Sequence, residues 1–344
     1  MSTLLRAAGR LTTPFLPDDY LTLVNPLWSL RELRGRIEAV IPETADAATV
    51  VVKPGHGWTT HRAGQYVRVG VDIDGVRQSR TYSLTSPTSR TDGRFTFTVK
   101  AIPDGLVSNH LVRDARPGDV LVLEQPQGEF VLPDELPAKV LFLTGGSGIT
   151  PVMGMLRSHR LPDVVHVHGA PTESAVVFGA ELRALTSPSY RLHEFHDDAT
   201  GMFTFDRLDE LCPDWREREV WVCGPGPLMD AAEVHWKAAG QTDRLRLERF
   251  RPRLLADGAE GGEVVFVKSA TTLDVDGATA LLDAGEAAGV LMPSGCRMGI
   301  CHGCVIPLLA GRVRDLRTGD VHGEEGDLIQ TCISAAAGPV ELDL

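Results

Sequence analysis

Four cysteines near the carboxyl-terminal end constrain this chain more than any other feature. Three of them lie within residues 294–304, Ser-Gly-Cys-Arg-Met-Gly-Ile-Cys-His-Gly-Cys, and are spaced C-x4-C-x2-C. A fourth cysteine follows further along the chain. Plant-type [2Fe–2S] clusters are bound by cysteines with this spacing. The sequence therefore predicts a cluster whose ligands are Cys296, Cys301, Cys304 and Cys332.

A zinc site and a chance group of buried thiols are alternative explanations of these cysteines. Zinc ligands more usually come as two C-x2-C pairs, which this spacing does not provide. A cluster also needs a short loop whose backbone N–H groups face the sulfides, and Gly295, Gly299 and Gly303 supply the conformational freedom for such a loop. The spacing therefore favours the iron–sulfur cluster.

Composition limits the class of protein. A chain of 344 residues is long enough for two or three domains, each with its own core. No apolar run approaches the roughly 20 residues that span a bilayer, and the N-terminus lacks a signal-peptide core. We therefore expect a cytoplasmic protein. The formal net charge of −12 argues against a nucleic-acid partner.

Changes in the hydrophobic pattern divide the chain into predicted domains. Short alternating or β-branched runs predict an antiparallel β-barrel over residues 34–136, with one helix at 106–114. Continuous apolar strands that alternate with helical stretches predict a parallel α/β sheet over 137–250. The predicted barrel strands are 36–41, 48–52, 65–71, 80–86, 94–100 and 120–123.

The two ends of the chain complete this organisation. A linker rich in Pro, Gly and polar residues, 251–262, precedes a small sheet with one helix across it over 263–344. Residues 1–33 show no clean helical or strand period, and we expect an extension that packs on the body. Trp28 and Leu30 could instead touch a partner or a membrane surface.

The barrel carries a candidate flavin site in Arg80-Thr-Tyr-Ser83. An Arg fork suits a phosphate, an aromatic ring can stack on an isoalloxazine, and a hydroxyl can face its N5 edge. Gly105-Leu-Val-Ser-Asn109, at the start of the predicted helix, offers backbone N–H groups to a pyrophosphate. The alternative is a strand with an ordinary Arg and Tyr.

A second glycine-rich turn opens the α/β domain. Gly145, Gly146 and Gly148 follow a buried strand and precede a helix, where a dinucleotide pyrophosphate would lie, although they do not form G-x-G-x-x-G. Such a turn can also be purely structural. The second half of the site would be Cys223-Gly224-Pro225, whose small residues let a nicotinamide ring approach the flavin.

These motifs together resemble the ferredoxin–NADP reductase superfamily, and within it the three-domain oxygenase and desaturase reductases ordered flavin, nicotinamide, ferredoxin. Gly64-Gln-Tyr66 and Pro126-Gln-Gly-Glu-Phe130 are further barrel matches, and the resemblance extends into the N-terminal extension. It implies a FAD-binding barrel, an NAD(P)-binding α/β domain and a β-grasp [2Fe–2S] domain.

The resemblance also implies roles for individual residues. FAD would be bound by Arg80, Tyr82 and Ser83, with Lys100 and Ser108 near its phosphates. The nicotinamide cofactor, NADPH or NADH, would lie at Gly145, Gly146, Thr150 and Cys223, and Phe250 would lie near the flavin. Ser83 and Cys223 are the expected catalytic residues.

The chain departs from its relatives at one place. Where relatives often have Ser-Arg or Arg residues for a 2′-phosphate, this chain has His196-Asp197-Asp198. Two carboxylates there would disfavour the phosphate unless Arg191 or Arg207 folds over the ribose. We therefore expect NADH to be used at least comparably to NADPH.

The expected function is electron transfer from NAD(P)H through FAD and the [2Fe–2S] cluster to a terminal acceptor protein. The resemblance favours a membrane-bound di-iron fatty-acyl desaturase, which would place the protein peripherally at the membrane through its acceptor. The alternatives are the reductase component of a soluble oxygenase or cytochrome P450 system, and a non-enzymatic regulatory subunit that binds zinc.

Overall fold

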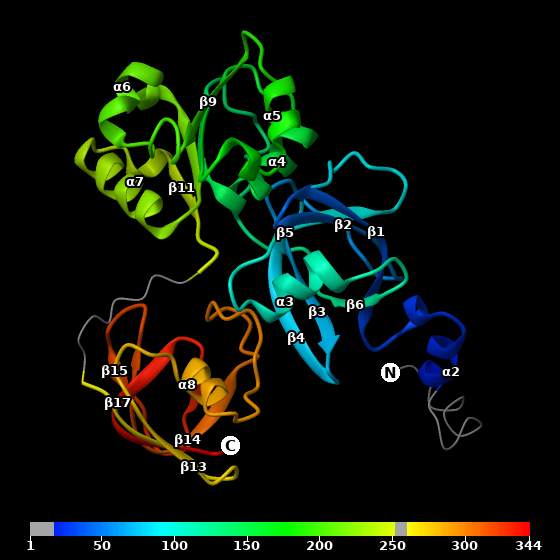
Figure 1. Ribbon diagram of the computed structural model, residues 1–344, viewed down its shortest axis with the longest axis vertical. Coiled ribbons are helices and arrows are strands. Elements are labelled where there is room, and N and C mark those ends of the chain that lie inside the picture. Colours follow the sequence, from blue (N-terminus) through cyan, green and yellow to red (C-terminus); the bar gives the residue numbers. More distant parts are fainter. Residues whose placement is uncertain (1–16, 252–259) are drawn as a thin grey trace. The chain divides into compact units, whose positions relative to one another are not determined.

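The computed structural model describes residues 17–251 and 260–344. The chain divides into two compact units, one of Met1–Arg77 with Thr81–Glu248 and the other of Gln78–Arg80 with Arg249–Leu344. The first unit contains an antiparallel barrel and a parallel α/β sheet, and the second contains a mixed sheet with one helix (Figure 1). The predicted fold class is confirmed.

Six antiparallel strands form the barrel, in the order β4-β3-β6-β1-β2-β5. They are β1 Leu33–Thr44, β2 Ala47–Pro54, β3 Tyr66–Ile73, β4 Val76–Ser83, β5 Phe95–Lys100 and β6 Val120–Leu123. Beyond the end of β4, Leu84 bridges Phe97 of β5, and the Thr85 N–H donates to the Thr96 carbonyl oxygen (2.8 Å). These contacts join the two edges of the sheet and close the barrel.

All six predicted barrel strands are present. The largest shift is in β4, which ends at Ser83, whereas the sequence predicted a strand at 80–86. The predicted helix at 106–114 is a short α-helix, α3 Leu106–Asn109, which continues as a turn of π-helix, η2 His110–Asp114.

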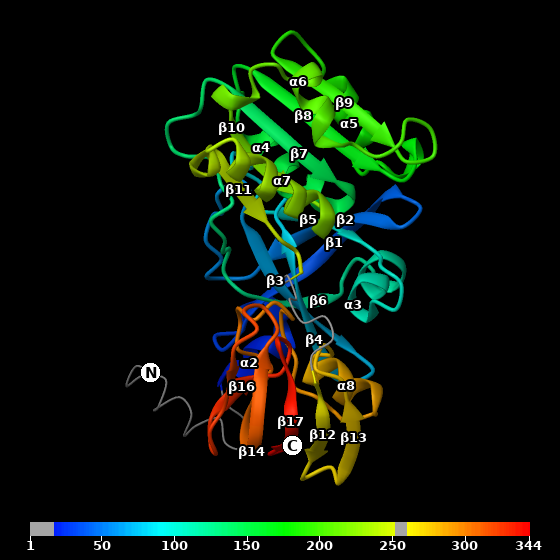
Figure 2. The same cartoon turned by 90° about the vertical axis from the view of Figure 1, so that its left-hand side faces the viewer.

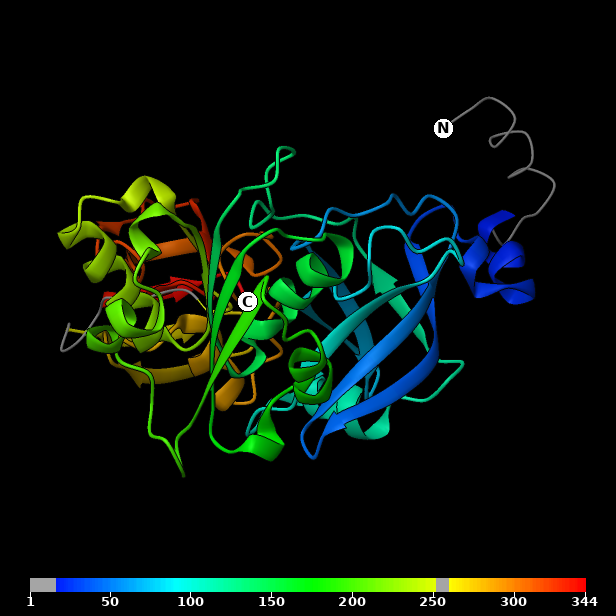
Figure 3. The same cartoon turned by 90° about the horizontal axis from the view of Figure 1, so that it is seen from above.

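Five parallel strands form the α/β sheet, in the order β11-β10-β7-β8-β9. They are β7 Val140–Gly145, β8 Val164–Ala170, β9 Tyr190–His196, β10 Glu219–Cys223 and β11 Leu245–Glu248. The helices are α4 Ile149–Ser158, α5 Gly179–Ala184, α6 Leu208–Leu211 and α7 Gly226–Ala238. Helices α4 and α5 cover one face of the sheet, and α6 and α7 cover the other (Figures 1 and 3).

Strand β7 shows why this sheet is buried on both faces. Val140 and Phe142 join the core beneath α4 and α5, whereas Leu141 and Leu143 join the core beneath α6 and α7. Side chains alternate between the faces of a strand, so a continuous apolar run is needed to fill both cores.

The second unit is a mixed sheet with the order β13-β12-β17-β14-β15, and β16 pairs with β14. Its strands are β12 Gly262–Phe266, β13 Thr271–Val275, β14 Val305–Asp315, β15 Val321–His322, β16 Leu328–Gln330 and β17 Ser334–Leu342. Helix α8 Leu281–Ala287 packs on it through Leu281, Leu282 and Ala284 (Figure 2). The central strand β17 was not predicted.

The N-terminal extension contains a helix that the sequence analysis did not predict, α2 Pro17–Val24, followed by a 3-10 turn, η1 Pro26–Trp28. Eight residues are too few for a helical period to stand out. Among the described residues, no helix has both the length and the apolar character needed to cross a membrane.

Candidate functional site

The two predicted halves of the nicotinamide site meet at the carboxyl edge of the parallel sheet. A Cβ on Gly148 would lie 2.0 Å from the carbonyl oxygen of Cys223, and one on Gly145 would lie 2.7 Å from Cδ of Pro225. A Cβ on Gly224 would lie 2.9 Å from the Gly145 nitrogen. These glycines are needed because the turn after β7 and the turn after β10 pack backbone to backbone.

Gly146 and Thr150 occupy different environments in this turn. Gly146 has a φ of +53° and open space where a Cβ would point, as expected for a turn that leaves its backbone accessible. Thr150 is buried, and its hydroxyl donates to the Ser147 carbonyl oxygen (2.9 Å), which fixes the first turn of α4. The backbone of Gly146 is therefore accessible at this turn, and its contact with the dinucleotide stays a prediction.

Helix α4 connects this turn to the flavin strand of the barrel. A Cβ on Gly154 would lie 2.5 Å from the carbonyl oxygen of Leu84, the residue after Ser83. The Arg157 guanidinium donates to the Thr85 carbonyl oxygen (2.8 Å), and the Thr88 N–H donates to the Ser158 hydroxyl (3.1 Å). The helix that begins at the glycine turn thus packs directly against the end of β4.

The predicted flavin residues lie at the end of β4. The Tyr82 ring stacks on Phe97, with centroids 5.3 Å apart and planes at 17°. Ser83 is buried at the last position of the strand. The Arg80 guanidinium donates to the Ser79 carbonyl oxygen (2.7 Å). Ser83 directly precedes Leu84, whose carbonyl oxygen lies beside Gly154, so the end of β4 lies close to α4.

The two residues predicted near the FAD phosphates make local contacts. The Lys100 ammonium pairs with Asp46, at 2.6 and 2.7 Å from its carboxylate oxygens. The Ser108 hydroxyl donates to the Gly105 carbonyl oxygen (3.0 Å) and accepts from the Ile102 N–H (3.3 Å). These bonds shape the loop before α3, and contact with a phosphate stays a prediction.

The structure adds one candidate that the sequence analysis missed, Glu248. It ends β11 and is the register partner of Cys223 on β10. Burial raises the pKa of Glu248 to about 7, and burial raises the pKa of the Cys223 thiol well above its usual range. A carboxyl group beside Cys223 can therefore hold a proton at neutral pH, and the thiol stays neutral.

A Glu248→Gln substitution should remove one source of pH dependence in the free energy of unfolding. The pKa of Glu248 is higher in the folded protein than in the unfolded chain. The resulting contribution to the free energy of unfolding is fully present below the ordinary carboxyl pKa of 4.5, and it is lost as the pH rises through about 7. We expect the free energy of unfolding of wild type to fall between these pH values by about 3 kcal/mol relative to Glu248→Gln. Denaturant unfolding at a series of pH values measures this. A constant difference would contradict it.

A buried polar network supports the carboxyl edge of the sheet. The Thr144 hydroxyl lies 2.7 Å from Nε2 of His166 and 2.8 Å from Nδ1 of His168. Nδ1 of His166 lies 2.6 Å from the Tyr190 hydroxyl. Burial lowers the pKa of both histidines, so both are neutral and act as structural hydrogen-bonding groups next to Gly145.

The loop after β9 carries the residues expected to distinguish NADPH from NADH. Asp197 and Asp198 are exposed, and their N–H groups donate to the carbonyl oxygens of Ala170 and Pro171 at the end of β8. Arg191 pairs with Asp163 at the opposite end of β9 (3.0 Å), so it does not flank this loop.

Arg207 is the other basic residue weighed for the ribose phosphate. Its guanidinium lies over the ring of Phe195, 4.7 Å from the centroid, near the end of β9. It is therefore the better placed of the two arginines.

The second unit holds the four cysteines, two in the loop between α8 and β14 and two beside strand ends. Cys304 immediately precedes β14, and Cys332 follows β16 with one residue between them. Because Val305 pairs with Gln330, the two cysteines lie side by side, and the Thr331 hydroxyl donates to the Cys304 carbonyl oxygen (2.9 Å). Strand register thus brings Cys332, the predicted fourth ligand, beside Cys304.

Backbone N–H groups surround the sulfur atoms, as a cluster requires. The Cys296 and Gly303 N–H groups donate to Sγ of Cys301 (3.1 and 3.3 Å), and the Met298 N–H donates to Sγ of Cys296 (3.3 Å). Arg297 has a left-handed φ of +58° and pairs with Asp283 and Glu286 of α8. The loop is therefore held in a strained shape of the kind found at ligand sites.

Two of the predicted ligands, Cys304 and Cys332, contact each other. A hydrogen bond from Cys332 lowers the pKa of Cys304 to about 6, and the same contact raises the pKa of Cys332. Within the described part of the chain, no three His, Cys, Asp or Glu side chains converge as a single-ion site.

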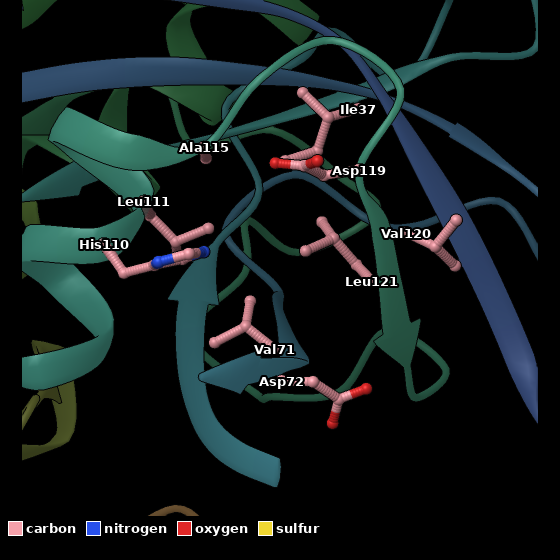
Figure 4. A pocket seen from close by; sticks show the side chains of 9 residues that line it. All are labelled: Ile37, Val71, Asp72, His110, Leu111, Ala115, Asp119, Val120 and Leu121. Carbon is pink, nitrogen blue, oxygen red and sulfur yellow. The ribbon is translucent and has the colours of Figure 1, made fainter. Parts of the chain in front are cut away.

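Two cavities lie apart from the predicted cofactor residues. One of about 210 Å³ opens within the barrel. Its lining comes from β1, β3, β6 and the helix before β6, with His110, Asp72 and Asp119 around mainly apolar side chains (Figure 4). The other, of about 350 Å³, lies between β13 and α8 in the second unit.

Phe250 is about one-third exposed and lies two residues after Glu248, the last residue of the first unit. Its predicted place near the flavin stays a prediction, as do the cofactor contacts of the other predicted residues.

Comparison with known proteins agrees with this geometry. The oxidoreductase FAD-binding domain family matches residues 50–132, and the 2Fe-2S iron-sulfur cluster binding domain family matches residues 265–337. The solved structure of phthalate dioxygenase reductase, a modular protein for electron transfer from pyridine nucleotides to [2Fe–2S], superposes with a TM-score of 0.63. It is 25% identical, and the match covers 91% of this chain and 98% of that one.

The chain belongs to the three-domain ferredoxin reductase family, and it is an oxidoreductase that uses FAD, a [2Fe–2S] cluster and NAD(P)H. Among individual proteins, it is 51% identical to the NADPH oxidoreductase of Mycobacterium tuberculosis, over 98% of this chain and 91% of that protein. It is 31% identical to the ferredoxin reductase component of 3-ketosteroid-9-alpha-monooxygenase from Mycolicibacterium smegmatis, over 86% and 89% of the two chains.

Proposed function

We propose that this protein passes electrons from NAD(P)H through FAD and the [2Fe–2S] cluster to a membrane-bound fatty-acyl desaturase. When bound, FAD accepts a hydride from the nicotinamide, and the cluster then carries the electrons one at a time. The observation that carries the proposal is the packing of α4, whose Gly154 contacts Leu84 beside Ser83 while its first turn follows the glycine turn. Hydride transfer requires two such sites to be held in contact.

The chain's own residues have separate tasks in this scheme. The Arg80 fork and the Tyr82 ring bind and orient the flavin, and the Ser83 hydroxyl faces its N5 edge. The Cys223 side chain is buried and neutral, and its small size lets the nicotinamide ring approach the flavin. Glu248 holds a proton beside Cys223 at neutral pH.

The acceptor is the finer part of the proposal. The resemblance of the N-terminal extension to that of desaturase reductases supports a desaturase, and the protein would then work in the cytoplasm at the membrane through its acceptor. A soluble oxygenase or cytochrome P450 is the second candidate, because one relative is named as the reductase component of a monooxygenase.

Reconstitution distinguishes these acceptors. The purified, cofactor-loaded chain would be mixed with NAD(P)H and either membranes containing a fatty-acyl desaturase or a soluble oxygenase component. We expect NAD(P)H-dependent desaturation only with the membranes. Turnover with a soluble oxygenase and none with the desaturase would identify the oxygenase as the acceptor and reject the desaturase. Failure to reduce any one-electron acceptor, including cytochrome c, would reject the reductase function itself.

The dinucleotide preference follows from the acidic loop after β9. We expect kcat/KM for NADH to be at least comparable to that for NADPH, because Asp197 and Asp198 would repel a 2′-phosphate by a few kcal/mol. Asp197→Arg should raise kcat/KM for NADPH about tenfold relative to NADH. Glu210→Arg, an equal charge change on α6, is the control and should leave the ratio unchanged. A wild-type preference for NADPH above about a hundredfold, nearly 3 kcal/mol, would show that this pair points away from the ribose.

A further inference from the structure

Arg157, in the last turn of α4, binds both the barrel and helix α5. Its Nη1 donates to the Thr85 carbonyl oxygen (2.8 Å), just beyond the end of β4. Its Nε and Nη2 donate to the two carboxylate oxygens of Glu181 on α5 (2.8 and 2.5 Å). Figure 1 shows α4 and α5, in green, on the face of the sheet next to the barrel. One side chain therefore joins three elements of the first unit.

The Thr85 carbonyl is a firm attachment point in the barrel. Thr85 is fully buried, its N–H donates to the Thr96 carbonyl oxygen (2.8 Å), and its hydroxyl lies 2.9 Å from the Thr96 hydroxyl. Leu84 is also buried, and its N–H donates to the Gln65 carbonyl oxygen (2.8 Å). Because Ser83, Leu84 and Thr85 are consecutive and closely held, a displacement of Thr85 would be transmitted to Ser83.

The start of α5 has an unfavourable backbone conformation at this contact. Phe178 directly precedes the helix, is buried, and has a left-handed φ of +60°. A bulky residue takes this conformation only where its surroundings fix it, and such residues cluster at functional sites. The Arg157 guanidinium lies over the Phe178 ring, 4.6 Å from the centroid. Arg157 thus also contacts the strained residue that begins α5.

The other end of α4 carries the glycine turn. Gly148 directly precedes the helix, whose ten residues span about 15 Å. Arg157 lies about two helical turns further along the chain than Gly148. The contact of Arg157 with Thr85 and the glycine turn are therefore at opposite ends of one helix.

We propose that Arg157 is a positioning residue for hydride transfer, which fixes the distance between the end of β4 and the glycine turn by holding Thr85 against the last turn of α4. The reaction moves a hydride, one proton with two electrons, from the nicotinamide, which is oxidised, to the flavin, which is reduced. Its rate depends steeply on how the two sites are placed. The inference rests on the proposed place of the flavin at the end of β4.

Arg157→Lys tests the proposal in the cofactor-loaded protein without removing the charge. A lysine ammonium can pair with Glu181, but it cannot reproduce the planar fork that also reaches the Thr85 carbonyl. Stopped-flow flavin reduction at saturating NAD(P)H should slow about tenfold, because a displacement of 1 Å can cost about a hundredfold and this one should be smaller. The apparent dissociation constant for NAD(P)H should stay unchanged, because the glycine turn is intact.

Hydrogen–deuterium exchange gives a second measurement that does not depend on activity. In Arg157→Lys, the amides of Leu84 and Thr85 should exchange several-fold faster, because the end of β4 loses its attachment to α4. Glu181→Gln removes the carboxylate that orients the guanidinium, and it should also slow flavin reduction. Combining the two substitutions should add no further loss to that of Arg157→Lys, because both break the same contact.

Arg244→Lys is the matched control. Arg244 also bridges a backbone carbonyl and a carboxylate, since its Nη1 donates to the Glu217 carbonyl oxygen (3.2 Å) and to the Glu219 carboxylate (3.1 Å). These partners lie at the start of β10, the opposite end of that strand from the glycine turn. The substitution should leave both flavin reduction and the exchange of Leu84 and Thr85 unchanged.

Three results would overturn the proposal. A normal rate of flavin reduction in Arg157→Lys would show that this contact does not position the reactants. Slower reduction without faster exchange at Leu84 and Thr85 would show that the end of β4 had not moved. Equal loss in Arg244→Lys would show that the effect is not specific to α4. Wild-type protein whose flavin is not reduced by NAD(P)H would reject the proposed function, and this inference with it.

Discussion

Replacing Cys301 with alanine is expected to abolish electron transfer through the iron–sulfur centre while leaving flavin reduction by NAD(P)H intact. Sγ of Cys301 accepts hydrogen bonds from two backbone N–H groups, and Cys301 is the least buried of the four cysteines. Its replacement should therefore remove a predicted ligand without opening the core. Cytochrome c reduction should fall at least a hundredfold. Stopped-flow bleaching of the flavin by NAD(P)H and reduction of a small dye should stay within a factor of two.

The matched control is Cys212→Ala, which removes a buried thiol outside the predicted ligand set. It should retain the visible absorption of the cluster and the rate of cytochrome c reduction. A Cys301→Ala protein that keeps a full complement of iron and sulfide, or normal one-electron transfer, would show that this cysteine is not a ligand.

Gly148→Ala should damage both stability and hydride transfer. The new methyl group would lie 2.0 Å from the Cys223 carbonyl oxygen, so the turn after β7 and the turn after β10 must separate. Overpacking of this kind costs roughly 1–3 kcal/mol. A shift of about 1 Å between the two halves of the site should also slow flavin reduction about a hundredfold. Thermal unfolding and stopped-flow reduction measure the two effects.

Gly226→Ala is the control for this substitution. Gly226 begins α7 in the same part of the sheet and has open space where its Cβ would point. Its replacement should change the melting temperature by no more than about a degree or two. The rate of flavin reduction should stay unchanged. Equal behaviour of the two alanine variants would show that the turns are not packed as described.

Local patterns in the sequence were sufficient for much of the fold. Continuous apolar runs identified the doubly buried strands, and turn residues delimited the barrel strands, because these signals depend on neighbours along the chain. Strand β17 was missed for the opposite reason. Its sequence begins Ser-Ala-Ala-Ala-Gly-Pro, which has little strand propensity, and it is a strand because it pairs with both β12 and β14.

The same distinction applies to the candidate site. The cysteine spacing predicts the cluster ligands and the glycine-rich sequence predicts the dinucleotide turn, because both signals lie in contiguous stretches of the chain. Glu248 could not be identified in this way, because its position beside Cys223 depends on the parallel pairing of β10 with β11. The contact of Gly154 with Leu84 likewise joins segments that nothing in the sequence links.

Helix α4 also limits how such reductases can be recombined. Its first turn follows the glycine turn of the nicotinamide domain, and its Gly154 packs against the end of a barrel strand. A nicotinamide domain taken from another protein would have to reproduce that interface. The part of the chain after Glu248 has its own core and its own sheet. An engineered fusion would therefore have to exchange the barrel and the nicotinamide sheet together, whereas the hydrophobic core of the iron–sulfur module depends on neither.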